Sequence, residues 1–148
     1  MKYDHLYLSP HFDDAALSCG GQIATWTAAR QSVLVVTITG GGPPAAPGSD
    51  PGRALHDRWA TSLMAEGQPE AAAAMVAQRR AEDRAALALL RAGWLHLPFL
   101  DCIYRCGPDD DALYPGPTDM FGPPNPADAA TLAALAEAFA ALPPAGRV

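Results

Sequence analysis

Short apolar runs alternate with helix-like segments along this chain. Residues 6–8 and 33–39 are apolar or β-branched and predict two strands. The second run is uninterrupted, which is typical of a strand covered on both faces. Residues 94–100 predict a third strand, and Pro98 indicates its end or an edge location. The strands are therefore short and separated by long connections.

The connections contain apolar residues at helical spacing. They predict helices over 15–29, around Leu55, Trp59 and Leu63, over 70–91, and from Asp128 as N-cap to 142. Glycine and proline gather in residues 40–52 and 107–127, which predicts loops over the ends of the strands. Such loops commonly carry substrate specificity.

This order of elements predicts an α/β fold. With right-handed crossovers it gives a Rossmann-like three-layer sandwich with a mainly parallel sheet in strand order 3-2-1. A doubly wound sheet would place a fourth strand beside the first. The last predicted helix ends near residue 142 and the sequence stops at 148, so we expect strands 4 and 5 to be missing. We interpret residues 1–148 as a single domain truncated at its C-terminus, and an uncovered first strand would favour a homo-oligomer.

Composition narrows the class of protein further. The chain has 148 residues, of which 49% are hydrophobic, enough for one domain with a core. A net charge of -6 and scattered arginines argue against nucleic acid as a partner. No apolar stretch is long enough for a signal peptide or a membrane span, so we expect a cytoplasmic protein. The three cysteines favour buried thiols over disulfides, and a metal pair of Cys102 and Cys106 is the less favoured alternative.

The turn after the first strand holds the candidate chemistry. It places His11, Asp13 and Asp14 within four residues of one another, at the strand end where open α/β sheets carry their sites. His11 and Asp14 could bind zinc, which would acidify a water and polarise a carbonyl, while Asp13 stays free as a general base. This arrangement predicts hydrolysis of an amide or an ester. The alternative is structural: both aspartates cap the following helix and His11 is an ordinary loop residue.

The residues around this turn resemble a known family. Ser-Pro-His-Phe-Asp-Asp-Ala-Ala-Leu-Ser-Cys-Gly-Gly, residues 9–21, is similar to the signature of the PIG-L (LmbE-like) zinc-dependent de-N-acetylases, which remove acetyl groups from N-acetylglucosamine-containing substrates. Blocks at 36–43, 79–83 and 99–105 follow in the family's order, so the resemblance covers residues 3 to about 105.

The resemblance implies a function and a set of site residues. His11 and Asp14 would be ligands of Zn2+ or another divalent metal, and Asp13 the catalytic base. Arg79 and Asp101 look like the family's substrate-binding residues. The substrate would be a small N-acetylated sugar or glycoside. Without the resemblance, Arg79 and its neighbours Arg80, Glu82 and Asp83 would be interpreted as a solvated helix face.

One departure from the family concerns the third metal ligand. The family supplies it from a histidine block after the fourth strand, and no histidine follows Asp101 here. The activity of this chain alone is therefore in question, since two protein ligands make a poor zinc site. Among the other histidines, we expect His5 at the surface of the opposite end and His96 in the core. His56, beside the loop over 40–52, is the one that could approach the metal.

Two further interpretations remain open. A phosphoacceptor receiver domain also places acidic residues after its strands, as Asp13, Asp14 and Asp101 would be, but it needs a lysine where this chain has none, since Lys2 is its single lysine. The second interpretation is a catalytically incomplete fragment, or a non-enzymatic remnant that binds a partner through the first strand. Gel filtration separates this last possibility from a monomeric enzyme.

Overall fold

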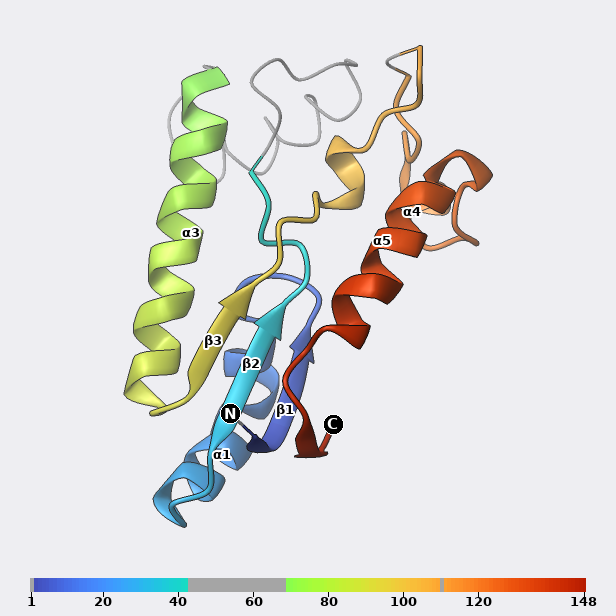
Figure 1. Ribbon diagram of the computed structural model, residues 1–148. Helices are drawn as coiled ribbons and strands as arrows, with labels where there is room; N and C mark the ends of the chain where they lie inside the picture. The colour runs from blue at the N-terminus through green and yellow to red at the C-terminus, as the bar shows by residue number, and fades with distance from the viewer. Residues whose placement is uncertain (1, 43–68, 110) are drawn as a thin grey trace.

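The computed structural model describes residues 2–42, 69–109 and 111–148. Its sheet contains β1 (Tyr3–Ser9), β2 (Val33–Thr37), β3 (Gly93–His96) and β4 (Ala145–Arg147) in the order β3-β2-β1-β4. All neighbouring strands are parallel. The predicted order 3-2-1 is confirmed, and the three strands end at the same edge of the sheet (Figure 1).

The fourth strand was predicted to be missing, and this is wrong. β4 lies beside β1, with Tyr3 opposite Ala145 and His5 opposite Arg147. No apolar run marks it, because three residues paired only at the start of β1 can be held by backbone hydrogen bonds. Gly146 suits this close approach, since a Cβ there would lie 3.0 Å from the carbonyl oxygen of Asp4. The first strand is therefore not the outermost strand of the sheet.

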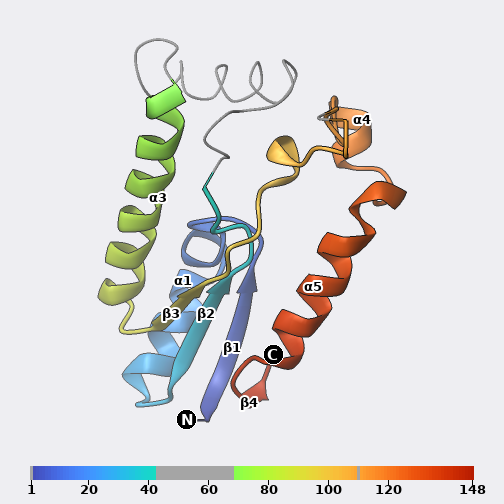
Figure 2. The same cartoon turned by 45° about the horizontal axis from the view of Figure 1, so that its top comes forward.

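Helices cover both faces of the sheet. α1 (Asp14–Ala28) and α3 (Pro69–Leu89) lie on one face, and α5 (Ala129–Ala140) lies on the other (Figures 1 and 2). This is the predicted α/β three-layer sandwich. The short elements η1 (Cys102–Tyr104), α4 (Pro117–Met120) and η2 (Pro126–Asp128) lie in the connection between β3 and α5.

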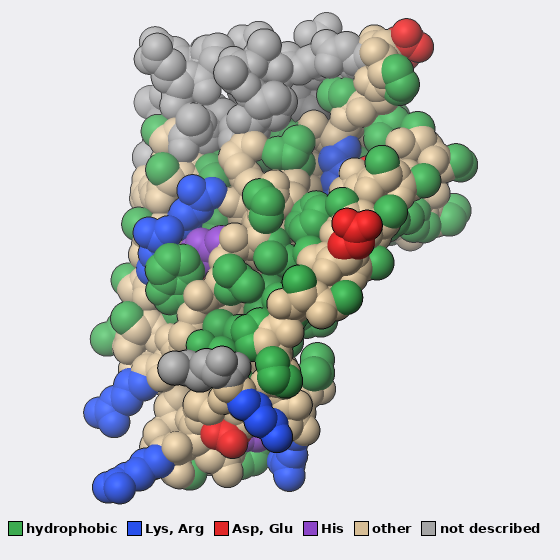
Figure 3. Space-filling view, viewed as in Figure 1, with side chains coloured by type: hydrophobic (Ala, Val, Ile, Leu, Met, Phe, Trp, Pro, Cys, Tyr) green, Lys and Arg blue, Asp and Glu red, His purple; other side chains and the backbone are tan. Residues whose placement is uncertain are grey.

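Strand alternation divides the core into two apolar clusters. Val33 and Val35 face α1 and α3 together with Ile23 and Leu87. Leu6, Leu34, Val36 and Leu97 face the other side, where Phe139 and Leu142 pack against them. Figure 3 views the molecule from this second side, and hydrophobic side chains gather there between α3 and α5. Because β2 is buried on both faces, its uninterrupted apolar sequence is explained.

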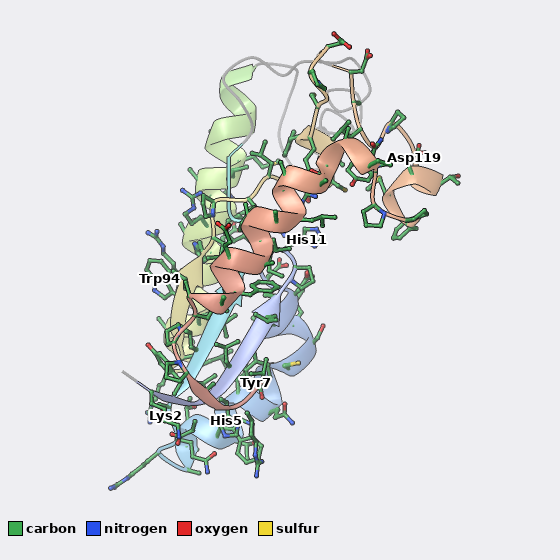
Figure 4. The ribbon with its side chains drawn as sticks, turned by 45° about the vertical axis from the view of Figure 1, so that its right-hand side comes forward. Lys2, His5, Tyr7, His11, Trp94 and Asp119 are labelled. Carbon is green, nitrogen blue, oxygen red and sulfur yellow. The ribbon has the colours of Figure 1, made fainter. Side chains whose placement is uncertain are left out.

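His5 differs from its predicted surface location. His5 is only 6% exposed, and its ring stacks on Trp26 at a centroid distance of 4.6 Å. Its Nε2 also forms a hydrogen bond with the side chain of Gln31. The prediction failed because His5 shares the α1-facing side of β1 with Tyr7, which alternation along the strand could have indicated. Figure 4 shows His5 at the opposite end of the sheet from His11, as predicted.

Two predicted features lie outside the described residues. These are the helix around Leu55, Trp59 and Leu63, together with His56, and most of the loop over 40–52. In the described part of the chain, no helix is both long and apolar enough to cross a membrane.

Candidate active site

A pocket opens at the edge of the sheet where β1, β2 and β3 end. Its volume is about 370 Å³. Its lining comes from the turn after β1, the segments after β2 and β3, and α3: His11, Phe12, Asp13, Asp14, Thr39, Gly41, Met75, Val76, Arg79, Asp101, Ile103 and Tyr104. All five site residues predicted from the sequence are in this set. Parallel strands bring them together because their carboxyl ends share one edge.

Ser9 holds the turn after β1 in shape. It is 1% exposed, its hydroxyl donates to the carbonyl oxygen of His11 at 2.8 Å, and its Oγ accepts from the amide of Ala15 at 3.1 Å. Ser9 thus satisfies an amide of the first turn of α1 from outside the helix. The side chain of Asp13, the N-cap residue, forms no capping hydrogen bond. The carboxylate of Asp13 is therefore left for the pocket, and its interpretation as a helix cap is wrong. Asp14 is the first residue of α1, and its carboxylate accepts from the amide of His11.

Replacing Ser9 with alanine tests this arrangement. We expect Ser9→Ala to lower the free energy of unfolding by about 1–3 kcal/mol, since the buried amide of Ala15 and the partly buried carbonyl of His11 lose their partner. Urea unfolding followed by circular dichroism measures the change. Ser18→Ala, an exposed serine on α1, is the control and should change the free energy by less than about 0.5 kcal/mol. Equal effects of the two substitutions would contradict the role given to Ser9.

Two carboxylates hold the imidazole of His11. Its Nδ1 lies 3.1 Å from Asp14 Oδ2, and its Nε2 lies 3.2 Å from Asp101 Oδ2. The amide of His11 also donates to Asp14 Oδ2, at 3.0 Å. The hydrogen bond to Asp101 and the neighbouring negative charges raise the pKa of His11 above its usual value, against the effect of burial. Figure 4 shows His11 beyond the carboxyl end of the strands.

Asp101 is fixed at the start of η1. Its carboxylate accepts from the amide of Ile103 at 3.3 Å and faces His11 with its other oxygen. Burial by itself would raise the pKa of Asp101, but the hydrogen bond and charge of His11 outweigh it and hold the pKa below its usual value. Asp101 was predicted to bind substrate. In the structure its side chain orients His11, and a contact with substrate stays a prediction.

Asp13 points to α3 and forms an ion pair there. Its Oδ2 lies 2.9 Å from an Nη2 donor of Arg79, and both side chains are 37% exposed. Burial, with the nearby carboxylate of Asp14 adding to it, raises the pKa of Asp13, although the charge of Arg79 works in the opposite direction. Arg79 was also predicted to bind substrate. It lines the pocket and holds Asp13, so a second role toward substrate stays a prediction.

The donor set fits a divalent metal only in part. An imidazole and a carboxylate at neighbouring positions, His11 and Asp14, are ligands that zinc accepts. Both nitrogens of His11 face carboxylates, so one nitrogen would have to exchange its proton for the metal. Within residues 2–42, 69–109 and 111–148, no group of three or more His, Cys, Asp or Glu is arranged to hold a metal. The described residues therefore supply two candidate ligands, and His56 lies outside them.

The solvated helix face predicted for residues 79–83 is found at Glu82, which is exposed, whereas Arg79, Arg80 and Asp83 contact other elements. Asp83 is 2% exposed, and its Oδ2 lies 2.8 Å from Nε2 of His96 on β3. Arg80 donates to the carbonyl oxygen of Gly40, and Arg79 pairs with Asp13. Sequence reasoning missed Asp83, although a signal existed: it stands four residues before the buried Leu87 and so shares its face of the helix.

The cysteines give no support to a metal pair. Cys102 and Cys106 are both free thiols and half-buried. Burial, with the charge of Asp101 adding to it, raises the pKa of the Cys102 thiol to about 11. A metal binds the thiolate, which is therefore disfavoured here at neutral pH.

Comparison with known families gives one match over most of the chain. Residues 6–138 match the family described as PIG-L, GlcNAc-PI de-N-acetylase. A comparison with curated protein sequences gives no significant match.

Solved structures of deacetylases are similar to this fold. The deacetylase of the teicoplanin biosynthesis pathway, in complex with teicoplanin, is 30% identical with a TM-score of 0.69, and the similarity covers 94% of this chain and 52% of that one. A zinc-inhibited form of teicoplanin deacetylase is 36% identical, with a TM-score of 0.59 over 76% of this chain and 38% of that one. The pseudoaglycone deacetylase for the antimicrobial A40926 is 38% identical, with a TM-score of 0.53 over 70% and 39%. The chain thus spans about half the length of the first of these relatives.

Proposed function

The chain belongs to the PIG-L (GlcNAc-PI de-N-acetylase) family, and from this premise we propose that its pocket takes part in the zinc-dependent hydrolysis of an N-acetyl group on a small N-acetylglucosamine-type sugar or glycoside. One observation carries the proposal: an imidazole and three carboxylates from two strand ends meet an arginine of α3 in one pocket. The reaction consumes water and releases acetate and a free amine. A cytoplasmic location remains a prediction from the sequence.

Five residues of the pocket have a proposed part in this reaction. His11 and Asp14 would hold the metal, with a further ligand from outside the described residues. When bound, the metal would polarise the acetyl carbonyl and acidify a water. Asp13 would accept a proton from the attacking water, and Arg79 would keep its carboxylate directed into the pocket. Asp101 would fix the ring orientation of His11, the usual part of a carboxylate behind a histidine ligand.

The similar deacetylases support this proposal at the level of the reaction class. One of them was solved in a zinc-inhibited form, which supports a metal site in such proteins. Teicoplanin, named in another, makes glycosides a reasonable class of substrate. The specific substrate of this chain is a proposal of class only.

Zinc binding tests the metal part of the proposal. We expect the purified chain to bind one zinc ion at micromolar concentration in calorimetry, and Asp14→Ala to weaken binding by about tenfold or more, since it removes a ligand. Asp109→Ala changes an exposed aspartate outside the pocket and should bind zinc as the parent does. Absence of zinc binding in the parent chain at micromolar concentration would contradict the metal site as proposed.

Acetate release tests the reaction. Incubation of the zinc-loaded chain with an N-acetylglucosaminide should give acetate and the free amine in equal amounts. The catalytically incomplete fragment or partner-binding remnant stays the alternative prediction, and it is favoured if zinc binds without any release of acetate.

A further inference from the structure

Asp83 is a buried carboxylate that joins three elements behind the pocket. It lies on α3 and is 2% exposed. Its Oδ1 accepts from the backbone amide of Asp13 at 3.0 Å, and its Oδ2 lies 2.8 Å from Nε2 of His96 on β3. Asp83 does not line the pocket itself. Its direct hydrogen bond to a pocket residue is the one to the backbone amide of Asp13.

A carboxylate at this place needs both of its partners. Burying a charged group costs several kcal/mol unless hydrogen bonds and opposite charge offset the loss of water. An apolar side chain beside the buried Leu87 would carry no such cost. What the carboxylate adds at this position is an acceptor for the amide of Asp13.

The backbone of Asp13 requires support. Its φ of 66° and ψ of -15° lie in the left-handed region. For a residue other than glycine this conformation costs about 1–2 kcal/mol, although aspartate tolerates it better than most. The conformation turns the side chain away from the helix end, so that it meets Arg79 instead of capping α1. Asp83 accepts the hydrogen bond that the amide offers in this conformation.

His96 fixes the second oxygen of Asp83. The side chain of His96 is 5% exposed, and burial lowers its pKa below the usual value, which favours the neutral ring. Among the described residues its Nδ1 has no hydrogen-bond partner, and because a carboxylate can only accept, Nε2 carries the proton and donates to Asp83. The ring also meets the edge of Phe12, next to Asp13, at a centroid distance of 5.0 Å. Asp83 is thereby held with Oδ1 free for the amide.

We propose that Asp83, held by His96, is a positioning residue that keeps the backbone of Asp13 in the conformation which directs its carboxylate into the pocket. The inference rests on the proposed function, in which Asp13 accepts the proton of the attacking water. Neither Asp83 nor His96 touches the substrate in this arrangement.

Amide hydrogen exchange in the metal-free, isotopically labelled chain tests the inference without any activity. Asp83→Leu removes both acceptors, and Glu82→Leu makes a matched change at the exposed neighbouring position. We expect the amide of Asp13 to exchange at least about tenfold faster in Asp83→Leu and unchanged in Glu82→Leu. The amide of Leu17, which donates to the carbonyl oxygen of Asp13 at 2.8 Å, should keep its protection in both. Retained protection at Asp13, or joint loss at Asp13 and Leu17, would overturn the inference.

Two substitutions at His96 test the inference independently, in case the Asp83→Leu variant does not fold. The amide of glutamine can place a donor near Nε2, so His96→Gln should keep the protection of the Asp13 amide, whereas His96→Leu should lose it. Equal exchange in these two variants would also overturn the inference.

Kinetics then separate positioning from general stability. Where the chain releases acetate, we expect Asp83→Leu to lower kcat by about 10–100-fold with little change in KM, as for other supporting residues. Parent-like kcat in a folded Asp83→Leu variant would overturn the inference. Should the parent release no acetate, the proposed reaction fails, while the exchange measurement still decides the role of Asp83.

Discussion

Asp13→Asn should lower kcat for N-acetyl hydrolysis by about 10²–10⁴-fold, the range for loss of a general base. Asparagine keeps the size of the side chain and an oxygen that can accept from Arg79, which lies 2.9 Å from Asp13 in the parent. It also tolerates the left-handed conformation of this residue. What it cannot do is take a proton from water. The effect should therefore fall on the chemical step.

The measurement compares kcat, KM and zinc affinity for the parent, Asp13→Asn and Asp109→Asn. Asp109 is exposed and outside the pocket, so its variant should match the parent in all three. For Asp13→Asn we expect KM and zinc affinity to stay within about threefold, because neither His11 nor Asp14 is altered. A kcat within twofold of the parent would exclude Asp13 as the base, and a large loss of zinc affinity would make it a ligand instead.

The sequence could predict the position of the site because topology alone determines it. Once β1, β2 and β3 are taken as parallel neighbours, the residues after them must meet at one edge of the sheet. This brings Asp101 to His11 although 90 positions separate them in the sequence. The two strand ends are further joined by the hydrogen bond from the amide of Gly41 to the carbonyl oxygen of Phe99 at 2.9 Å. A Cβ on Gly41 would lie 2.5 Å from the carbonyl oxygen of Pro98, which explains this glycine.

The partners of individual side chains could not be predicted in the same way. Arg79 and Asp83 stand four positions apart on α3, yet one reaches the pocket and the other is buried against β3. Composition alone predicts that both side chains are solvated, because the charged residues of a helix do not indicate where that helix packs against the sheet. Ser9 was similarly missed as a cap, since its partner Ala15 lies outside the spacing of ordinary capping motifs. Tertiary contacts decide the first two cases, and a local turn outside the known capping patterns decides the third.

Asp128→Ala should lower the free energy of unfolding by about 3–5 kcal/mol, the cost of breaking a buried ion pair by removing one partner. Asp128 precedes α5, and its side chain is 2% exposed. Its Oδ2 accepts from Arg105 at 2.8 Å and from the hydroxyl of Tyr114 at 2.9 Å. The substitution leaves the 18%-exposed side chain of Arg105 without its carboxylate. Sequence reasoning had assigned Asp128 only the role of an N-cap.

Because of the ion pair, we expect the contribution of Asp128 to the free energy of unfolding to depend on pH. Burial by itself would raise the pKa of Asp128, but hydrogen bonds from Thr131, Arg105 and Tyr114, together with the charge of Arg105, outweigh it and hold the pKa below its usual value. As the pH falls, the unfolded chain therefore binds a proton at this carboxyl at a higher pH than the folded chain does. The stabilisation is complete above the unfolded-state pKa of about 4 and is lost as the pH falls through the lower folded-state value.

Urea unfolding at pH 7 and at several values below pH 5 separates the ion pair from simple packing. The difference in unfolding free energy between the parent and Asp128→Ala should shrink as the pH falls, whereas the small difference for Asp109→Ala should stay near zero. A double variant, Arg105→Met with Asp128→Leu, removes both charges together and should recover part of the loss, since no unpaired charge remains buried. A loss that is equally large in the double variant and independent of pH would mean that Asp128 stabilises the start of α5 through packing, without the ion pair.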